Sequence, residues 1–312
     1  MGLEFMDHRG QGCLMRGLGM FREFLGRWRN SHSSALSMQP LENYITAARK
    51  LGLNRPYLFL SFDCDTDLDA SAAEGVHEFL ESLGIKATYA VPGAQLLRSP
   101  EPYQRLAMRG AEFMNHGGLP HAKWNGDQWV GMTFYDSMLP EEVEADIWRG
   151  HEIVSEVIGR VPVGFRAPHF GCYQKPEQID LLHRTAASLG YSYCSTTTPS
   201  SGLKYGPAYE THGILEIPCL GSIRNPETIL DSWTYLTDRK NYMLGDEYFN
   251  LMVETVDVCI KHQLPVVLNW YADPCHVLNQ PPFINAMKLL AKSGLASVTG
   301  TDLIEMVCSK PR

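Results

Sequence analysis

The sequence predicts an α/β protein in which parallel strands form a distorted (β/α)7-type barrel, with an extra helical segment at the N-terminus. From residue 57 onward, short apolar runs alternate with helical segments, which is typical of a parallel sheet with helical crossovers. The runs number close to seven, and a length of 312 residues suits one large barrel domain. Unusual polar clusters follow several of these runs, as expected of loops at the carboxyl edge of barrel strands.

The composition excludes several classes of protein. The chain is 44% hydrophobic and 20% charged, which is ordinary for a globular protein, and its net charge of −8 argues against a nucleic-acid-binding face. Eight cysteines are scattered without a CxxC pair, so we expect reduced thiols and no disulfide framework. No apolar stretch has the length of a membrane span, and the N-terminus lacks the residue order of a secretory signal, so we expect a cytoplasmic protein.

We expect residues 1–38 to form an N-terminal extension, helical or partly disordered, ahead of a barrel domain at residues 39–312. Residues 15–29 predict a basic amphipathic helix, because four apolar side chains share one face among arginines: Phe21, Phe24, Leu25 and Trp28. Such a helix could lie on a membrane surface or on a partner, which would make the protein membrane-peripheral. The alternative is a helix packed against the outside of the domain. The oligomeric state does not follow from the sequence.

The barrel domain begins with a short helix near residues 41–53 and then alternates strands and helices. The helix at 140–158 has the clearest signals, because Pro140 stands in its first turn and Gly159 follows its end. A long polar loop is expected at 116–138. We expect strands at 57–62, 86–91, 112–115, 163–166, 191–194, 215–218, 266–270 and 296–298. We expect further helices at 73–83, 102–109, 176–189, 246–262 and 283–292.

Carboxylates follow the first strand directly. Residues 63–67 hold three aspartates, and buried carboxylates are unfavourable unless a cation or hydrogen bonds stabilise them. Asp63 and Asp65 stand two residues apart, so in an extended chain they project the same way. This suits one metal-binding carboxylate beside one that is free to take a proton. The alternative is a capping cluster for the next helix, since Asp and Thr favour helix N-termini.

Two further clusters follow the third and fourth strands. His116 and His121 lie in a glycine-rich turn, and together with Asp65 they form a two-His, one-carboxylate set that suits zinc or another divalent metal. Arg166 stands at the end of the strand at 163–166, where it could hold Asp63 ionised and oriented. Each signal is modest alone, because surface histidines and turn arginines are common.

In order and spacing, these clusters resemble the motifs of the polysaccharide deacetylase family, the NodB-homology proteins similar to carbohydrate esterase family 4. The stretch 61–65 is similar to the first motif, 110–121 to the His-x-x-x-His motif with its approach, and 140–142 with 164–168 to the third. The resemblance covers residues 56–300 and implies a metal-dependent hydrolase acting on carbon–nitrogen bonds that are not peptide bonds.

The resemblance also implies roles for individual residues. Asp63 matches the catalytic base that acts on a metal-activated water, and Arg166 matches the residue that orients this base. Asp65, His116 and His121 match the metal ligands. The implied cofactor is a divalent metal, with zinc favoured and Co²⁺, Ni²⁺ or Mn²⁺ as alternatives.

The sequence departs from the family pattern in three places. His116 and His121 are five residues apart, whereas the family spaces its two histidines by four. The strand that usually ends in Leu-x-His, which supplies the general acid, reads 266–271 without a histidine; His276 is the nearest candidate for this acid and Tyr271 the next. The fourth motif, an Asp with a nearby Trp, is matched only loosely, by residues 231–233.

The function expected from these residues is removal of an N-linked acyl group, most simply acetyl, from a carbohydrate or glycoconjugate precursor. Expected partners are an N-acylated sugar, a sugar nucleotide or a lipid-linked glycan. Two alternatives stay open: a deformylase or cyclic-amide hydrolase with the same site, and a degenerate member that binds glycan without turnover. The residues assigned to substrate binding are Trp124, Pro168, His169, Trp233 and Tyr271.

Overall fold

The computed structural model describes residues 39–308. The extension expected at 1–38, with its amphipathic helix at 15–29, lies outside the described residues, so the boundary after residue 38 stays a prediction. By its internal contacts the chain divides into residues 1–42 and 43–312, and the barrel lies in the second unit. Among the described helices, none is both long and apolar enough to cross a bilayer.

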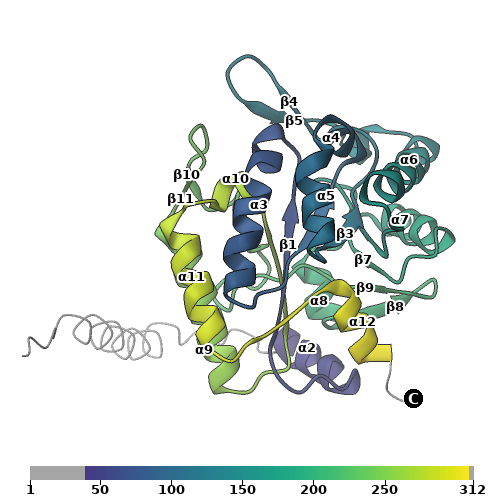
Figure 1. The fold of residues 1–312 in the computed structure, drawn as a ribbon. Helices are drawn as coiled ribbons and strands as arrows, with labels where there is room; N and C mark the ends of the chain where they lie inside the picture. The colour runs from purple at the N-terminus through teal and green to yellow at the C-terminus, as the bar shows by residue number, and fades with distance from the viewer. Residues whose placement is uncertain (1–38, 309–312) are drawn as a thin grey trace, which may run out of the picture. The chain divides into compact units, whose positions relative to one another are not determined.

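A nine-stranded sheet forms the centre of the second unit (Figure 1). Its order is β12-β1-β2-β3-β6-β7-β9-β8, with β13 also paired to β1; β8 alone runs antiparallel to its neighbour. The strands are β1 (Tyr57–Asp63), β2 (Thr88–Val91), β3 (Glu112–Asn115), β6 (Gly164–Arg166), β7 (Tyr193–Ser195), β8 (Tyr209–Thr211), β9 (Ile214–Glu216), β12 (Val267–Ala272) and β13 (Ala296–Val298).

The sheet curves toward a barrel that its strand ladders do not close. Strands β9 and β12 are not paired, but the Leu220 N–H donates to the Asn269 carbonyl over 3.0 Å. The Asn269 side-chain amide in turn donates to the carbonyl of Ile217 over 2.9 Å. The gap is therefore bridged by single hydrogen bonds, and the predicted distorted (β/α)7-type barrel is confirmed.

Helices surround the sheet (Figure 1). They are α2 (Gln39–Lys50), α3 (Asp67–Ser82), α4 (Gly93–Arg98), α5 (Pro100–Met108), α6 (Pro140–Ile158), α7 (Pro176–Ser188), α8 (Pro199–Tyr205), α9 (Asp246–Lys261), α10 (Pro274–Val277), α11 (Pro281–Lys292) and α12 (Gly300–Cys308). Short α4, α8, α10 and α12 were not expected from the sequence. Helix α3 begins at Asp67, earlier than the expected residue 73, because Thr66 and Asp69 form a capping box at its N-terminus.

The long loop expected at 116–138 contains a hairpin of β4 (Ala122–Trp124) and β5 (Trp129–Gly131), followed by a 3-10 turn, η1 (Tyr135–Ser137). A second hairpin, β10 (Leu236–Asp238) with β11 (Met243–Leu244), lies in the stretch between β9 and α9. The short strands of β4 and β5 are largely exposed, so they carry little apolar alternation that a sequence pattern could reveal.

Alternation along β1 and β12 sorts side chains between two compartments. Leu58, Leu60 and Phe62 of β1 belong to the large core cluster under the helices, as do three residues of β12: Leu268, Trp270 and Ala272. Phe59 and Val267 belong to the cluster inside the barrel. Since strand side chains alternate, Ser61 and Asp63 also face the barrel interior. The alternation of side chains therefore places polar groups inside the barrel at the carboxyl end of its strands.

Candidate active site and metal centre

Three side chains from two segments meet at the carboxyl edge of the sheet. Asp65 follows β1, and His116 and His121 follow β3; one ligand atom from each lies within 4.8 Å of the others. Asp65 Oδ1 is 3.3 Å from His121 Nδ1 and 3.7 Å from His116 Nε2. A zinc ion takes nitrogen and oxygen ligands at about 2.0–2.2 Å, so a cation between these atoms would fit with small side-chain adjustments.

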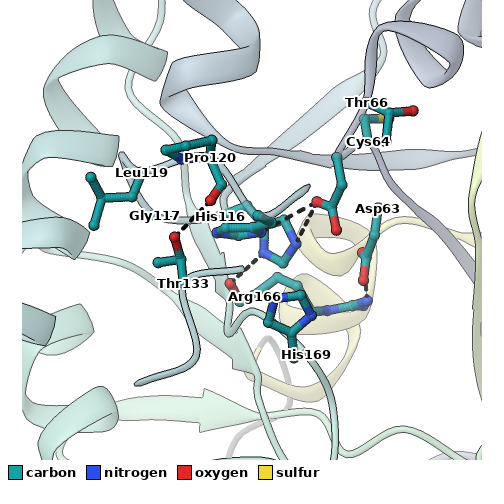
Figure 2. A network of polar contacts seen from close by, with 12 residues as sticks. Asp63, Cys64, Thr66, His116, Gly117, Leu119, Pro120, Thr133, Arg166 and His169 are labelled. Atoms are coloured by element: carbon teal, nitrogen blue, oxygen red, sulfur yellow. Dashed lines mark hydrogen bonds and ion pairs between the residues drawn. The ribbon is translucent and has the colours of Figure 1, made fainter. Parts of the chain in front are cut away.

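Unsatisfied polar atoms support this fit. Asp65 Oδ1 and both ring nitrogens of His121 are buried and have no hydrogen-bond partner. A buried polar atom without a partner is destabilising by about 1–3 kcal/mol, and a coordinated cation would satisfy it. The His116 ring is fixed by its Nδ1–H, which donates to the Arg166 carbonyl over 2.8 Å (Figure 2). The lone pair of Nε2, which lies 3.7 Å from Asp65 Oδ1, is then available to a cation. The donor set therefore suits a divalent metal.

The protonation states also suit metal binding. Burial, together with nearby His121, lowers the pKa of His116 well below its usual value, so this ring is neutral and can act as a ligand. Burial works against ionisation of Asp65, but the imidazoles of His121 and His116 more than offset it and lower the pKa of Asp65 to about 2. Both groups are thus in the form that a cation requires.

The five-residue spacing of the histidines is accommodated by contacts with helix α6. Gly117 adopts a positive φ of 79°, and the N–H groups of Gly118 and Leu119 donate to Asp146 Oδ1 over 3.0 and 2.7 Å. The turn brings His121 back beside His116, with ring centroids 4.4 Å apart. Asp146 was not identified from the sequence, because nothing in a helix pattern shows that a buried carboxylate will receive loop amides.

The hairpin that follows His121 holds it from the other side. The Met132 N–H donates to the His121 carbonyl over 2.7 Å, and the Thr133 hydroxyl donates to the Pro120 carbonyl over 2.6 Å (Figure 2). Hydrogen bonds to Asp146 of α6 therefore hold the loop before His121, and the hydrogen bond from Met132, which follows β5, holds His121 itself.

A second carboxylate lies beside the metal centre. Figure 2 shows the Arg166 guanidinium turned toward Asp63; Nη1 donates to Asp63 Oδ1 over 3.0 Å, and Nη2 donates to the Ser61 hydroxyl over 2.8 Å. Burial raises the pKa of Asp63 to about 7, although Arg166 opposes the shift. A carboxyl group that titrates near neutral pH can accept and return a proton.

The structure distributes the predicted substrate-binding residues over two zones. His169 lies close to the centre, with its ring 5.7 Å from that of His121 and its Nε2–H donating to the Met132 carbonyl over 2.7 Å. Tyr271 lies beside Arg166, whose guanidinium carbon is 5.4 Å from the tyrosine ring. Pro168 is buried. Trp124 on β4 and Trp233 are exposed, at 55% and 43%.

His276, the nearest sequence candidate for the acid, is almost completely buried. The whole residue is 2% exposed, and its ring is 4.6 Å from that of Tyr242 and 5.8 Å from that of Trp233. Burial lowers the pKa of His276 to about 3, so the ring is neutral. Its Nδ1 lies 3.0 Å from the Ser232 hydroxyl and 3.1 Å from Asp273 Oδ2.

Fold and site together define a class of protein: an α/β barrel with an Asp–His–His set at the carboxyl edge of its strands, next to an arginine-bound aspartate. Residues 50–193 match a family model described as Polysaccharide deacetylase. The resemblance predicted from the motifs is therefore confirmed over residues 50–193, and this resemblance supports a hydrolase that acts on carbon–nitrogen bonds of sugars.

Solved structures share the fold. One, from Mycobacterium smegmatis and assigned as a polysaccharide deacetylase, is 18% identical with a TM-score of 0.60 and covers 83% of this chain and 93% of its own. Puue allantoinase is 12% identical with a TM-score of 0.59, covering 83% and 92%. A Pseudomonas aeruginosa protein, also assigned as a polysaccharide deacetylase, is 12% identical with a TM-score of 0.58, covering 83% and 93%. Identities this low show the fold alone. No curated protein matches the chain in sequence.

Proposed function

We propose that this chain is a metal-dependent deacetylase that hydrolyses the amide bond of an N-acetylated carbohydrate. The observation that carries the proposal is the pairing of two groups in one site. Asp65 and His121 present buried ligand atoms that lack partners, and Asp63, two residues from Asp65, is held by Arg166. A metal-binding set beside an unligated, oriented carboxylate is the arrangement that amide hydrolysis by an activated water requires.

The ligands would be Asp65, His116 and His121, and zinc suits their one oxygen and two nitrogen donors. When bound there, a divalent cation supplies Lewis acidity, which lowers the pKa of water and polarises the acetyl carbonyl. Asp63 takes the proton of the attacking water. Arg166 orients Asp63 through Nη1 and holds His116 through its backbone carbonyl, so the base and a ligand keep a fixed separation.

The substrate would enter over the carboxyl edge of the sheet. His169 and Tyr271 lie next to the proposed ligand His121 and the orienting Arg166, and are placed to contact the acetyl group or its sugar ring. The exposed indoles of Trp124 and Trp233 offer apolar faces on which a further sugar ring could stack.

The test is release of acetate and formate from a panel of N-acylated sugars, sugar nucleotides and lipid-linked glycans, with and without chelator. We expect acetate release that stops on chelation and returns with zinc. Formate release instead would identify a deformylase. Absence of turnover on every compound, with tight glycan binding, would identify a non-catalytic member of the family.

An Asp63→Asn variant separates catalysis from metal binding. We expect it to keep its metal and to lose turnover by about 10²–10⁴-fold, because the base is removed while the three ligands remain. Wild-type turnover in this variant would contradict the role proposed for Asp63.

A further inference from the structure

We propose that Asp273 is the acid that protonates the leaving nitrogen, and that His276 and Ser232 position it. This inference rests on the proposed deacetylase function and assigns the proton donor for that reaction. An amine leaves an acyl carbon poorly unless its nitrogen is protonated as the bond breaks, so the site needs a donor besides Asp63, which receives a proton.

Strand register brings Asp273 to the same edge of the sheet as Asp63. Strands β1 and β12 are parallel neighbours, and Phe62 lies opposite Ala272. Asp63 is the next residue and ends β1, whereas Asp273 is the first residue after β12, and adjacent strands are about 4.8 Å apart. Asp273 keeps an extended backbone, with φ −94° and ψ 135°, so the side-chain alternation continues through it.

The same alternation decides which way the side chain faces. Phe62 and Ala272 both belong to the core under the helices. The next residues therefore face the barrel interior, where Asp63 meets Arg166. Asp273 thus reaches the compartment of the proposed base from the neighbouring strand.

Asp273 also has the exposure and the support that an acid requires. Its side chain is 25% exposed, whereas that of His276 is 3% exposed, so Asp273 can reach a substrate and His276 cannot. The Asp273 N–H donates to the Ser232 hydroxyl over 3.0 Å, and His276 Nδ1 lies 3.1 Å from Asp273 Oδ2. Contact with His276 fixes Oδ2 and leaves Oδ1 to carry the transferable proton.

The surroundings of this carboxyl favour its protonated form. Burial, followed by the neighbouring carboxylates, raises the pKa of Asp273 well above its usual value. Only a protonated carboxyl can donate, so the environment selects the form that the role demands. Four carboxylates add to this shift through their charge, namely Asp69, Asp65, Asp63 and Asp231, and the neutral ring of His276 lies against Asp273.

With Asp63 as proton acceptor and Asp273 as proton donor, the atoms and charges of the reaction balance. Water adds its oxygen to the acetyl carbon and gives one proton to Asp63. The carbon–nitrogen bond then breaks, its electron pair returns to nitrogen, and nitrogen takes the proton of Asp273. The products are acetic acid, which ionises, and the free amine; Asp63 releases its proton to solvent and Asp273 regains one from solvent.

The test compares two leaving groups in the metal-loaded enzyme. Asp273→Asn keeps the shape of the neutral acid but cannot donate a proton in the same way. On the N-acetyl amide identified from the substrate panel, we expect kcat to fall by about 10²–10⁴-fold. On p-nitrophenyl acetate, whose phenolate leaves without protonation, we expect a change of only a fewfold, with metal content unchanged.

Comparison variants make the outcome specific. Asp63→Asn should lose both the amide and the ester reaction, because water must be activated in each. Ester hydrolysis that remains in this variant measures the background from surface thiols such as exposed Cys308. Asp273→Glu retains a proton donor and should recover part of the amide activity. His276→Gln should lower amide kcat with little change in KM, and leave the ester reaction intact.

Three results would overturn the assignment. An Asp273→Asn enzyme that cleaves the amide at the wild-type rate needs no proton from this residue. If Asp273→Asn lowers kcat equally for the amide and the ester, Asp273 has a structural role and is not the proton donor. If the metal-loaded wild-type enzyme cleaves no amide, both the proposed function and the role of Asp273 are refuted. This result is obtained before any variant is made, so it is distinguishable from a failure of the Asp273 assignment alone.

Discussion

Arg166 on β6 donates a hydrogen bond of 3.0 Å to Asp63 on β1, although 103 residues separate them in the chain. The backbone carbonyl of the same arginine accepts a hydrogen bond from His116. One residue therefore orients the proposed base through its side chain and a proposed metal ligand through its main chain. A change of the Arg166 side chain should therefore affect the proposed base, whereas the hydrogen bond that holds His116 should remain.

Arg166→Lys should lower turnover while metal binding persists. A single ammonium cannot bond Asp63, Ser61 and Ser195 together, as the guanidinium does, so the base loses its fixed position. A misplacement of about 1 Å can lower the rate by about 10²-fold, and we expect a loss of that order in kcat. Metal content should match the wild type, because the carbonyl that holds His116 remains.

Arg184→Lys is the matched control. Arg184 pairs with Asp180 one turn away on the surface of α7, and both side chains are about half exposed, at 54% and 48%. This variant should keep wild-type turnover. Unchanged turnover in Arg166→Lys as well would remove any need for the guanidinium in orienting Asp63.

Much of this site could be predicted from local sequence. Asp63 and Arg166 end strands, and His116 and Asp65 stand within two residues of a strand end. Strand ends are readable from apolar runs that stop at polar residues. Because parallel strands end at one edge, a reader of the sequence can infer that these residues converge. Helix α6 was likewise predicted at its full length, since proline and glycine mark its ends.

Contacts that depend on packing between distant segments could not be read in this way. The return of His121 to the centre requires loop amides to meet Asp146, and no local pattern encodes that meeting. The approach of Asp273 to His276 and Ser232 likewise depends on how the chain after β12 folds against the segment before β10. A search for a histidine by motif spacing leads to His276, whereas the role proposed for Asp273 rests on contacts that spacing does not show.

His121→Ala should weaken metal binding strongly. The variant keeps Asp65 and His116 but loses one of the three proposed ligands, and both ring nitrogens of His121 are buried without a hydrogen-bond partner. In calorimetric titration with zinc we expect affinity to fall by at least 100-fold. In thermal melts, the stabilisation that zinc gives the wild type, about 2.7 kcal/mol at a hundredfold excess over Kd, should be largely lost.

His212→Ala is the control for that measurement. His212 lies on the surface and bonds Asp180 through Nε2 over 2.8 Å, so its removal should leave zinc affinity unchanged. Equal zinc affinity in His121→Ala and the wild type would remove His121 from the ligand set and leave its burial without an explanation.

Gly150→Ala should disturb the metal centre from helix α6. A Cβ at this position would overlap the Asn115 side chain and would lie 2.6 Å from the Gly117 carbonyl carbon, so the helix must move away from the loop that carries His116. Alanine favours a helix over glycine by about 1 kcal/mol, but overpacking of this kind opposes it by about 1–3 kcal/mol. We expect net destabilisation in urea and weaker zinc binding. The control is Glu156→Ala, because Glu156 is exposed on the same helix; it should change neither the free energy of unfolding nor the zinc affinity. If Gly150→Ala is instead more stable than the wild type and binds zinc normally, the loop and the helix can adapt to the added methyl group.

Glu216 forms a buried network at the end of β9 that should set part of the acid sensitivity of folding. Its carboxylate accepts hydrogen bonds from the N–H groups of Thr196 and Thr197, each over 2.8 Å, and lies 3.0 Å from His183 Nε2. Burial works against ionisation, but His183 and these amides more than offset it, so the pKa of Glu216 is lowered on folding. A lowered folded-state pKa gives stability that is fully present above the unfolded pKa and is lost as pH falls through the folded value.

Glu216→Gln should therefore be destabilised relative to the wild type at neutral pH, and less so in acid. A buried amide cannot satisfy both threonine N–H donors and also face His183 as a carboxylate does, which we expect to lower the free energy of unfolding by about 1–3 kcal/mol at pH 7. The difference should stay constant down to about pH 5 and shrink below about pH 4.3, where the unfolded wild type begins to bind its proton. Urea unfolding across pH measures it, with exposed Glu227→Gln expected to follow the wild type throughout. A difference that grows in acid would reverse the sign of the shift assigned to Glu216.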